Sequence, residues 1–193
     1  MSPPEVWGPA VWIFLHTLSG RINENAYPYL KNQLFSIIVA VCKVLPCPDC
    51  SNDASKFLAK ININDIKTKT EFKNMLYLFH NKVNAKKRKP LFNYSNLIIY
   101  ENFPLIQVIN NFINKYNTKG NMKLLAESFQ RTLIIKSFKS WFISNIKAFL
   151  PPQNTIIQSI KDSTEHNQII EELTKLNDTS ETQEEKKEST SEN

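Results

Sequence analysis

Residues 41–58 read VCKVLPCPDCSNDASKFL, and this stretch decides the fold. Pro46 ends an apolar helical segment that begins near Tyr29, and Pro48 opens a new helix at a position where proline is tolerated. The stretch therefore predicts two helices joined by a short turn, with Cys47 and Cys50 in the first turn of the second helix. Helix N-terminal amides favour a thiolate there, which suits redox chemistry.

Apolar residues recur at helical spacing on both sides of this stretch, and strand-like alternation is almost absent. Residues 11–22 carry one apolar stripe and, beside it, a second stripe with Trp12 and His16. The segment at 29–45 is apolar on nearly every face, so it is either a central helix or a dimer contact. A fourth helix follows a Thr68–Glu71 capping-box pattern and ends before Pro90. We expect a four-helix bundle over roughly residues 5–94, within an all-α fold.

Three regions follow from these patterns. Residues 1–94 form the four-helix domain, and residues 95–150 add a second helical layer with one helix at 105–116, a break at Gly120, and one long or two shorter helices beyond. Residues 151–193 hold four lysines and ten acidic residues, a net charge of −6, and end in an apolar-free run. Such a tail cannot bury enough surface to offset its chain entropy, so we expect it to be mostly disordered.

Composition excludes several classes of protein. The 193 residues contain 3 Gly and 12 Phe, which fits neither a collagen-like nor a wholly disordered chain. Three cysteines cannot build a disulfide-rich scaffold. No apolar run is long enough for a transmembrane helix, and the first residues show no secretory signal peptide.

Charge leaves a second functional class open. Residues 1–150 carry a net charge of +12, which invites a nucleic-acid reading. No helix-turn-helix, zinc-finger or RNP signature accompanies it, so a solvated lysine-rich surface is the simpler interpretation. A non-enzymatic basic assembly or nucleic-acid-binding protein is the alternative to an enzyme.

Cys47-Pro48-Asp49-Cys50 admits three interpretations by itself. A zinc site needs four ligands, and only Cys42, His16 and His80 are available to join the pair. A thioredoxin-like site needs a βαβ context, which the helical pattern does not provide. A redox pair in a helical bundle fits best, with Cys42 as a small buried apolar residue.

Three blocks in order then resemble one family. WGPAVWIFLH at 7–16 looks like G-x-x-x-W-x-x-L-H, LPCPDC at 45–50 like Y-P-C-x-x-C, and HNKVNAKKRKPLF at 80–92 like H-N-x-V-N-x-K-L-G-K-P-x-F. The family is that of the Erv/ALR FAD-linked sulfhydryl oxidases, including those of large cytoplasmic DNA viruses. The resemblance covers about residues 5–94.

The resemblance implies an enzyme with FAD as its cofactor. Cys47 and Cys50 would be catalytic: a substrate dithiol would reduce their disulfide at Cys47, and Cys50 would pass the electrons to FAD and on to oxygen, giving hydrogen peroxide. The residues that the resemblance assigns to cofactor binding are Gly8, Trp12, His16, Cys50, His80, Asn81, Val83, Asn84, Lys86 and Lys89. The i, i+4 pairs Trp12/His16 and His80/Asn84 each share a helix face, which agrees with enclosure of a flat aromatic group.

Partners and location also follow from the resemblance. We expect a protein dithiol or a separate thioredoxin-like carrier as substrate, molecular oxygen as acceptor, a homodimer through the first two helices, and neither a membrane nor a nucleic acid. Host cytoplasm or virion is the expected location for a viral member, and the mitochondrial intermembrane space is the alternative.

The sequence departs from the family pattern at several positions. Lys87 and Arg88 replace Leu-Gly, which leaves the turn there undefined. Tyr94 stands where relatives often carry a cysteine of a second disulfide, so packing must secure that segment. Every cysteine lies at or before Cys50, so we expect no internal shuttle pair. Tyr27 only loosely matches the family's tyrosine between the first two helices.

Overall fold

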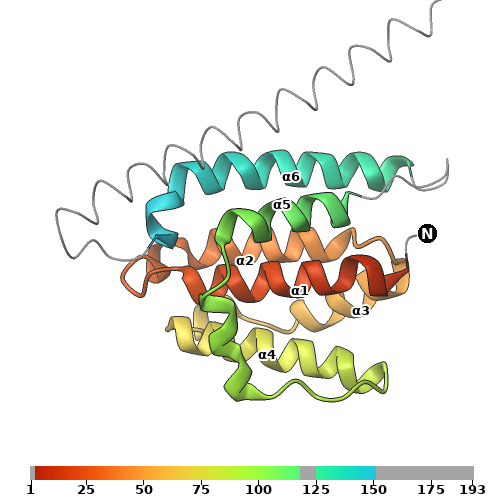
Figure 1. Cartoon of the computed structure of the whole chain (residues 1–193), viewed down its shortest axis with the longest axis horizontal. Helices are drawn as coiled ribbons and strands as arrows, with labels where there is room; N and C mark the ends of the chain where they lie inside the picture. The colour runs from red at the N-terminus through yellow and green to blue at the C-terminus, as the bar shows by residue number, and fades with distance from the viewer. Residues whose placement is uncertain (1–2, 118–124, 151–193) are drawn as a thin grey trace, which may run out of the picture.

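The computed structural model describes residues 3–117 and 125–150, and all regular structure in these ranges is helical (Figure 1). This confirms the predicted all-α class. The elements in chain order are α1 (Pro4–Arg21), α2 (Tyr27–Lys43), α3 (Pro48–Leu58), η1 (Ile63–Asp65), α4 (Lys69–Lys86), η2 (Tyr94–Glu101), α5 (Leu105–Tyr116), α6 (Leu125–Asn145) and η4 (Ile146–Phe149).

The helices form three layers. Figure 1 shows α1 and α2 in the middle, with α5 and α6 on one side and α3 and α4 on the other. α1 packs against α4 and α5, while α2 packs against α3 and α6. α1 is covered on both sides, since Phe14 stacks on Phe112 of α5 and Trp12 stacks on His80 of α4.

Local sequence sets the helix ends. Prolines stand in the first turn of α1, α2 and α3, where their missing N–H has no intrahelical partner to lose. The predicted capping box opens α4: the backbone N–H of Glu71 donates to Thr68 Oγ1, and the backbone N–H of Thr68 donates to Glu71 Oε2.

The two outer layers share one hydrophobic core with the central pair. On the α5 side, the rings of Phe14 and Phe112 stack with their centroids 3.8 Å apart, and both side chains are fully buried. At the other end of α1, Gly20 lies against η2, where an added Cβ would stand 2.9 Å from Glu101 Cγ. A larger residue there would push η2 away from α1.

The helix α2 is less covered than its sequence suggests. Its buried face carries Leu34, Ile38 and Val41, but Tyr29 is 83% exposed and Phe35 is only partly buried. The expectation of a helix covered on every side is therefore not met within one chain.

Residues 95–117 and 125–150 are largely helical. Leu105, Ile109, Phe112 and Tyr116 are buried in α5, and α6 is one long helix followed by η4. Phe129 of α6 is 62% exposed. The predictions for Gly120 and for the acidic tail at 151–193 lie outside the described residues. Within the described residues, no helix is long and apolar enough to cross a membrane.

Candidate active site

The two cysteines form a disulfide at the start of α3. Cys47 is the N-cap residue and Cys50 lies in the first turn, as the sequence predicts. The backbone N–H of Cys50 donates to Cys47 Sγ over 3.3 Å. The positive end of the helix dipole therefore lies next to the sulfurs, and it stabilises a thiolate once the disulfide is reduced.

A cavity of about 670 Å³ lies beside this disulfide. It is walled by the first half of α1, the end of α2, α3 and the second half of α4, with Tyr100 of η2 at one edge. Cys50 belongs to the wall and Cys47 does not. The predicted residues that also line the cavity are Gly8, Trp12, His80, Val83, Asn84, Lys86 and Lys89.

Aromatic rings from α1 and α4 meet at the cavity wall. Trp12 stacks on His80 with ring centroids 4.1 Å apart and planes 12° from parallel. His16 Nε2 and His80 Nδ1 lie 3.0 Å apart and share a hydrogen bond, although 64 residues separate them in sequence. The two histidines therefore act as one unit that joins α1 to α4.

Burial keeps both histidines neutral at physiological pH. It lowers the pKa of His16 to about 3, with a smaller contribution from His80, and it lowers the pKa of His80 to about 4. His16 Nδ1 is buried with no hydrogen-bond partner among the described residues. A proton on this nitrogen would be a buried, unpaired donor, so the tautomer with the proton on Nε2 costs less free energy. In that tautomer His16 Nε2–H donates to His80 Nδ1, and the Nε2–H of His80 is left for another acceptor.

Two predicted cofactor residues lie outside the cavity lining. His16 stands behind His80 and stacks on Tyr100 with centroids 4.7 Å apart. The side-chain amide of Asn81 donates from Nδ2 to the Phe92 carbonyl over 3.0 Å and accepts at Oδ1 from the Phe92 N–H over 2.7 Å. In this structure the two residues support the site: His16 positions His80, and Asn81 holds the segment after α4.

Lysines border the cavity on the α3 and α4 sides. Lys86 pairs with Asp53 over 2.5 Å, and Lys82 lies over the Phe57 ring at 5.5 Å from its centroid. The complete set of lining lysines is Lys56, Lys60, Lys82, Lys86, Lys87 and Lys89. This border is more cationic than the sequence analysis anticipated, since only two of these lysines were assigned to the site.

Other lining residues were also missed. Cys42 is free, 1% exposed and behaves as the predicted small apolar residue, yet it contributes to the wall. Tyr100 comes from η2, beyond the predicted boundary at residue 94. Lys56 lies in the last turn of α3 and Lys60 follows its end, and their spacing of four residues is a signal that could have placed them together.

The unusual Lys87-Arg88 pair forms a regular helix end. Arg88 has a φ of 53°, its N–H donates to the Ala85 carbonyl, and the Lys89 N–H donates to the Asn84 carbonyl. These two bonds define a Schellman motif with Arg88 at the left-handed position, where glycine is the preferred residue. The turn therefore persists without glycine.

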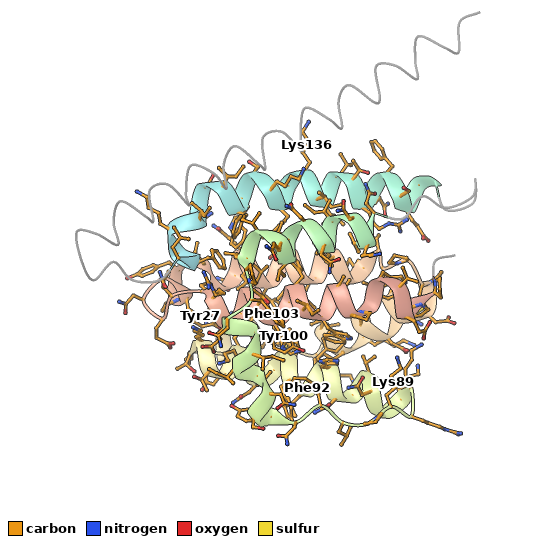
Figure 2. All side chains as sticks on the ribbon, in the orientation of Figure 1. Tyr27, Lys89, Phe92, Tyr100, Phe103 and Lys136 are labelled. Atoms are coloured by element: carbon orange, nitrogen blue, oxygen red, sulfur yellow. A yellow bond between two sulfur atoms is a disulfide. The ribbon has the colours of Figure 1, made fainter. Side chains whose placement is uncertain are left out.

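Tyr94 secures its segment by more than packing. Its hydroxyl donates to Asn74 Oδ1 over 2.7 Å, and its ring meets Tyr77 edge-on. Tyr27 is fully buried against Phe72 and takes no part in the cavity lining. Figure 2 shows it near the opposite end of the bundle from Lys89.

No group of three His, Cys, Asp or Glu side chains in residues 3–117 and 125–150 is arranged to hold a metal ion. Fold and site together define an all-α redox domain whose disulfide stands at the wall of an aromatic, lysine-bordered cavity. Residues 9–104, about half of the chain, match the model of the Erv1 / Alr family. The match includes η2, which the predicted boundary at 94 leaves out.

Several curated proteins are similar to this domain. A protein of Invertebrate iridescent virus 6, named as a candidate FAD-linked sulfhydryl oxidase, is 27% identical over 46% of this chain and 85% of its own length. The mitochondrial FAD-linked sulfhydryl oxidase erv1 of Schizosaccharomyces pombe is 30% identical over 45% of this chain and 48% of its own length. The FAD-linked sulfhydryl oxidase of African swine fever virus is 27% identical over 46% of this chain and 74% of its own length.

The chain thus spans about half the length of the fission-yeast relative and larger shares of the two viral ones. No solved structure matches the chain with comparable significance.

Proposed function

We propose that this chain is a FAD-dependent thiol oxidase that forms disulfide bonds in substrate dithiols. The observation that carries the proposal is the position of Cys50, which forms the disulfide with Cys47 and also lines a cofactor-sized cavity. The match to the Erv1 / Alr family model and the FAD-linked relatives support the same conclusion.

The residues around the cavity fit FAD. Its volume of about 670 Å³ lies within the range of cofactor pockets. Trp12 and His80 offer flat aromatic surfaces, and Asn84 and His80 offer polar groups for a ring edge. At Gly8 an added Cβ would meet no atom of another element within 4 Å, so the helix leaves room on the cavity side that the protein itself does not fill. Lys86 and Lys89 would neutralise a pyrophosphate.

The thiol–disulfide half of the reaction follows from the geometry. A substrate thiolate attacks Cys47 Sγ, the Cys47–Cys50 bond breaks, and its electron pair remains on Cys50 as a thiolate at the cavity wall. A second substrate thiolate then attacks the sulfur of the mixed disulfide that belongs to the substrate. The substrate leaves as a disulfide, Cys47 leaves as a thiolate, and the pair has gained two electrons.

FAD, when bound, supplies an acceptor for those two electrons and a route to molecular oxygen. The protein contributes position and electrostatics. The first turn of α3 stabilises the sulfur charge, and the neutral His16–His80 pair provides a hydrogen-bond donor without adding a positive charge.

The substrate and partners are part of the proposal. All three cysteines of the sequence lie at or before Cys50, so a separate protein dithiol or a thioredoxin-like carrier would reduce the pair directly. A homodimer would have to use what remains exposed of the first two helices, such as the surface around Tyr29, because α5 and α6 already cover one side of them. For a viral protein we propose the host cytoplasm or the virion, and for a cellular one the mitochondrial intermembrane space.

A visible spectrum and an oxygen electrode test the proposal. The purified chain should be yellow, consume oxygen with dithiothreitol, and yield hydrogen peroxide. Cys50→Ala should abolish turnover while the protein keeps its flavin, and Cys47→Ala should lose thiol exchange. A colourless protein whose nucleic-acid affinity falls steeply with salt would instead favour the basic assembly or nucleic-acid-binding alternative.

A further inference from the structure

The C-terminal end of α2 is held by side chains from the two helices that follow the family domain. The last carbonyls of a helix have no intrahelical partner and need other donors. The Tyr116 hydroxyl of α5 donates to the Val41 carbonyl over 2.9 Å, and Arg131 Nη1 of α6 donates to the Val44 carbonyl over 3.3 Å. Tyr116 is fully buried and Arg131 is 1% exposed.

These contacts lie directly before the redox pair. Val44 precedes Cys47 by three residues, and the intervening Leu45 and Pro46 are both buried. Pro46 has no N–H of its own, so the turn cannot close with a backbone bond from that residue. Side-chain donors therefore replace part of the backbone hydrogen bonding that would otherwise fix this turn.

Tyr116 and Arg131 are as deeply buried as Cys42, which directly follows Val41 in the sequence and lines the cavity. Burial raises the pKa of Tyr116, so its hydroxyl stays protonated and able to donate to the Val41 carbonyl. Tyr116 and Arg131 thus connect α5 and α6 to the end of α2, which is part of the cavity wall.

We infer that α5 and α6 belong to the redox site, with Tyr116 and Arg131 as positioning residues that fix the turn presenting Cys47 to Cys50. The inference rests on the proposed function only in that it treats this disulfide as the redox pair. The domain matched by the family model ends at residue 104, so this support comes from helices outside the matched residues.

The test measures the disulfide itself. Full-length wild type, Tyr116→Phe and Arg131→Lys are equilibrated anaerobically in mixtures of reduced and oxidised dithiothreitol, and the thiols are counted by alkylation and mass spectrometry. Removing the Tyr116 hydroxyl frees the turn, which gives the dithiol state more conformational freedom. We expect the equilibrium to shift toward the dithiol by about threefold.

Gln33→Leu is the matched control. Trp141 Nε1 donates to Gln33 Oε1 over 2.6 Å, so this variant also removes a hydrogen bond between α2 and α6, but at a site remote from the turn. It should lower the unfolding midpoint and leave the disulfide equilibrium unchanged. Arg131→Lys keeps the charge but loses the shape of the guanidinium, so it should shift the equilibrium in the same direction, and it carries the test if Tyr116→Phe does not fold.

An unchanged equilibrium in the folded variant, or a shift toward the disulfide, would overturn the inference. A colourless wild-type protein would refute the proposed function and leave this measurement interpretable, since thiol counting needs neither flavin nor oxygen.

Discussion

Gly8 provides the sharpest link between the fold and the cavity. It lies inside α1, where glycine destabilises a helix by roughly 0.5–1 kcal/mol relative to alanine. A Cβ added there would meet nothing within 4 Å apart from its chain neighbours and the helix's own backbone, so packing against other elements gives no reason for glycine. Substitution by a larger residue should therefore weaken flavin binding by filling cavity space.

Gly8→Leu and Gly8→Ala are the paired variants. Both add a Cβ directly before Pro9, where it meets the proline ring in a helical backbone, so Gly8→Ala controls for this effect on stability in urea titrations. The leucine side chain would also occupy cavity space, and overpacking of this kind should weaken flavin binding by about tenfold or more, measured by titration of absorbance. Alanine should weaken it much less.

Two outcomes would refute this reasoning. Wild-type flavin affinity in Gly8→Leu would show that the cofactor does not approach this turn of α1. An equal loss of flavin affinity in Gly8→Ala and Gly8→Leu would show that the effect comes from the backbone of α1 and not from occupied cavity space.

Three further predictions follow from the site. His16 and His80 stay unprotonated in the folded protein down to about pH 3 and pH 4, whereas both bind protons below about pH 6.5 in the unfolded chain. The unfolding free energy measured in urea should therefore fall as the pH drops from 6.5 toward 4, by at most about 1.4 kcal/mol per pH unit for each histidine. A flat profile would contradict the neutral pair. Arg88→Gly should raise the unfolding free energy by roughly 0.5–1 kcal/mol, because glycine adopts the left-handed backbone of this residue without strain. An unchanged urea midpoint would show that Arg88 is not strained at this position. Asn81→Ala should lower thermal stability by about 1–3 kcal/mol through the two lost bonds to Phe92, and an effect on flavin alone would return Asn81 to direct cofactor contact.

Local signals in the sequence predicted much of this fold. Pro46 and Pro48 flank the turn between α2 and α3, and the Thr68–Glu71 pair opens α4 as a capping box. Each of these features depends on residues within four positions of one another, so one sequence is sufficient to find it. The position of Cys47 at the N-cap of α3 belongs to the same group.

Contacts between residues far apart in the sequence could not be predicted from local patterns. The hydrogen bond between His16 and His80 depends on how α1 and α4 cross, and the family resemblance, not periodicity, placed both residues at one site. Tyr116 and Arg131 reach the end of α2 from 75 and 87 positions away, and nothing in their local sequence indicates it. The sequence could not decide the role of Asn81, because a side-chain amide can hydrogen-bond either a cofactor or, as here, the backbone of Phe92.

Anaerobic reduction by dithiothreitol tests the central claim most directly, with the flavin absorbance band followed in wild type, Cys50→Ser and Cys47→Ser. Electrons that pass through Cys50 at the cavity wall should bleach the wild-type band within a single turnover. Both variants should keep their colour under the same conditions, since each lacks the disulfide that accepts electrons from the thiol. Bleaching of Cys50→Ser at the wild-type rate would contradict the account, because the flavin would then take its electrons without the cysteine pair.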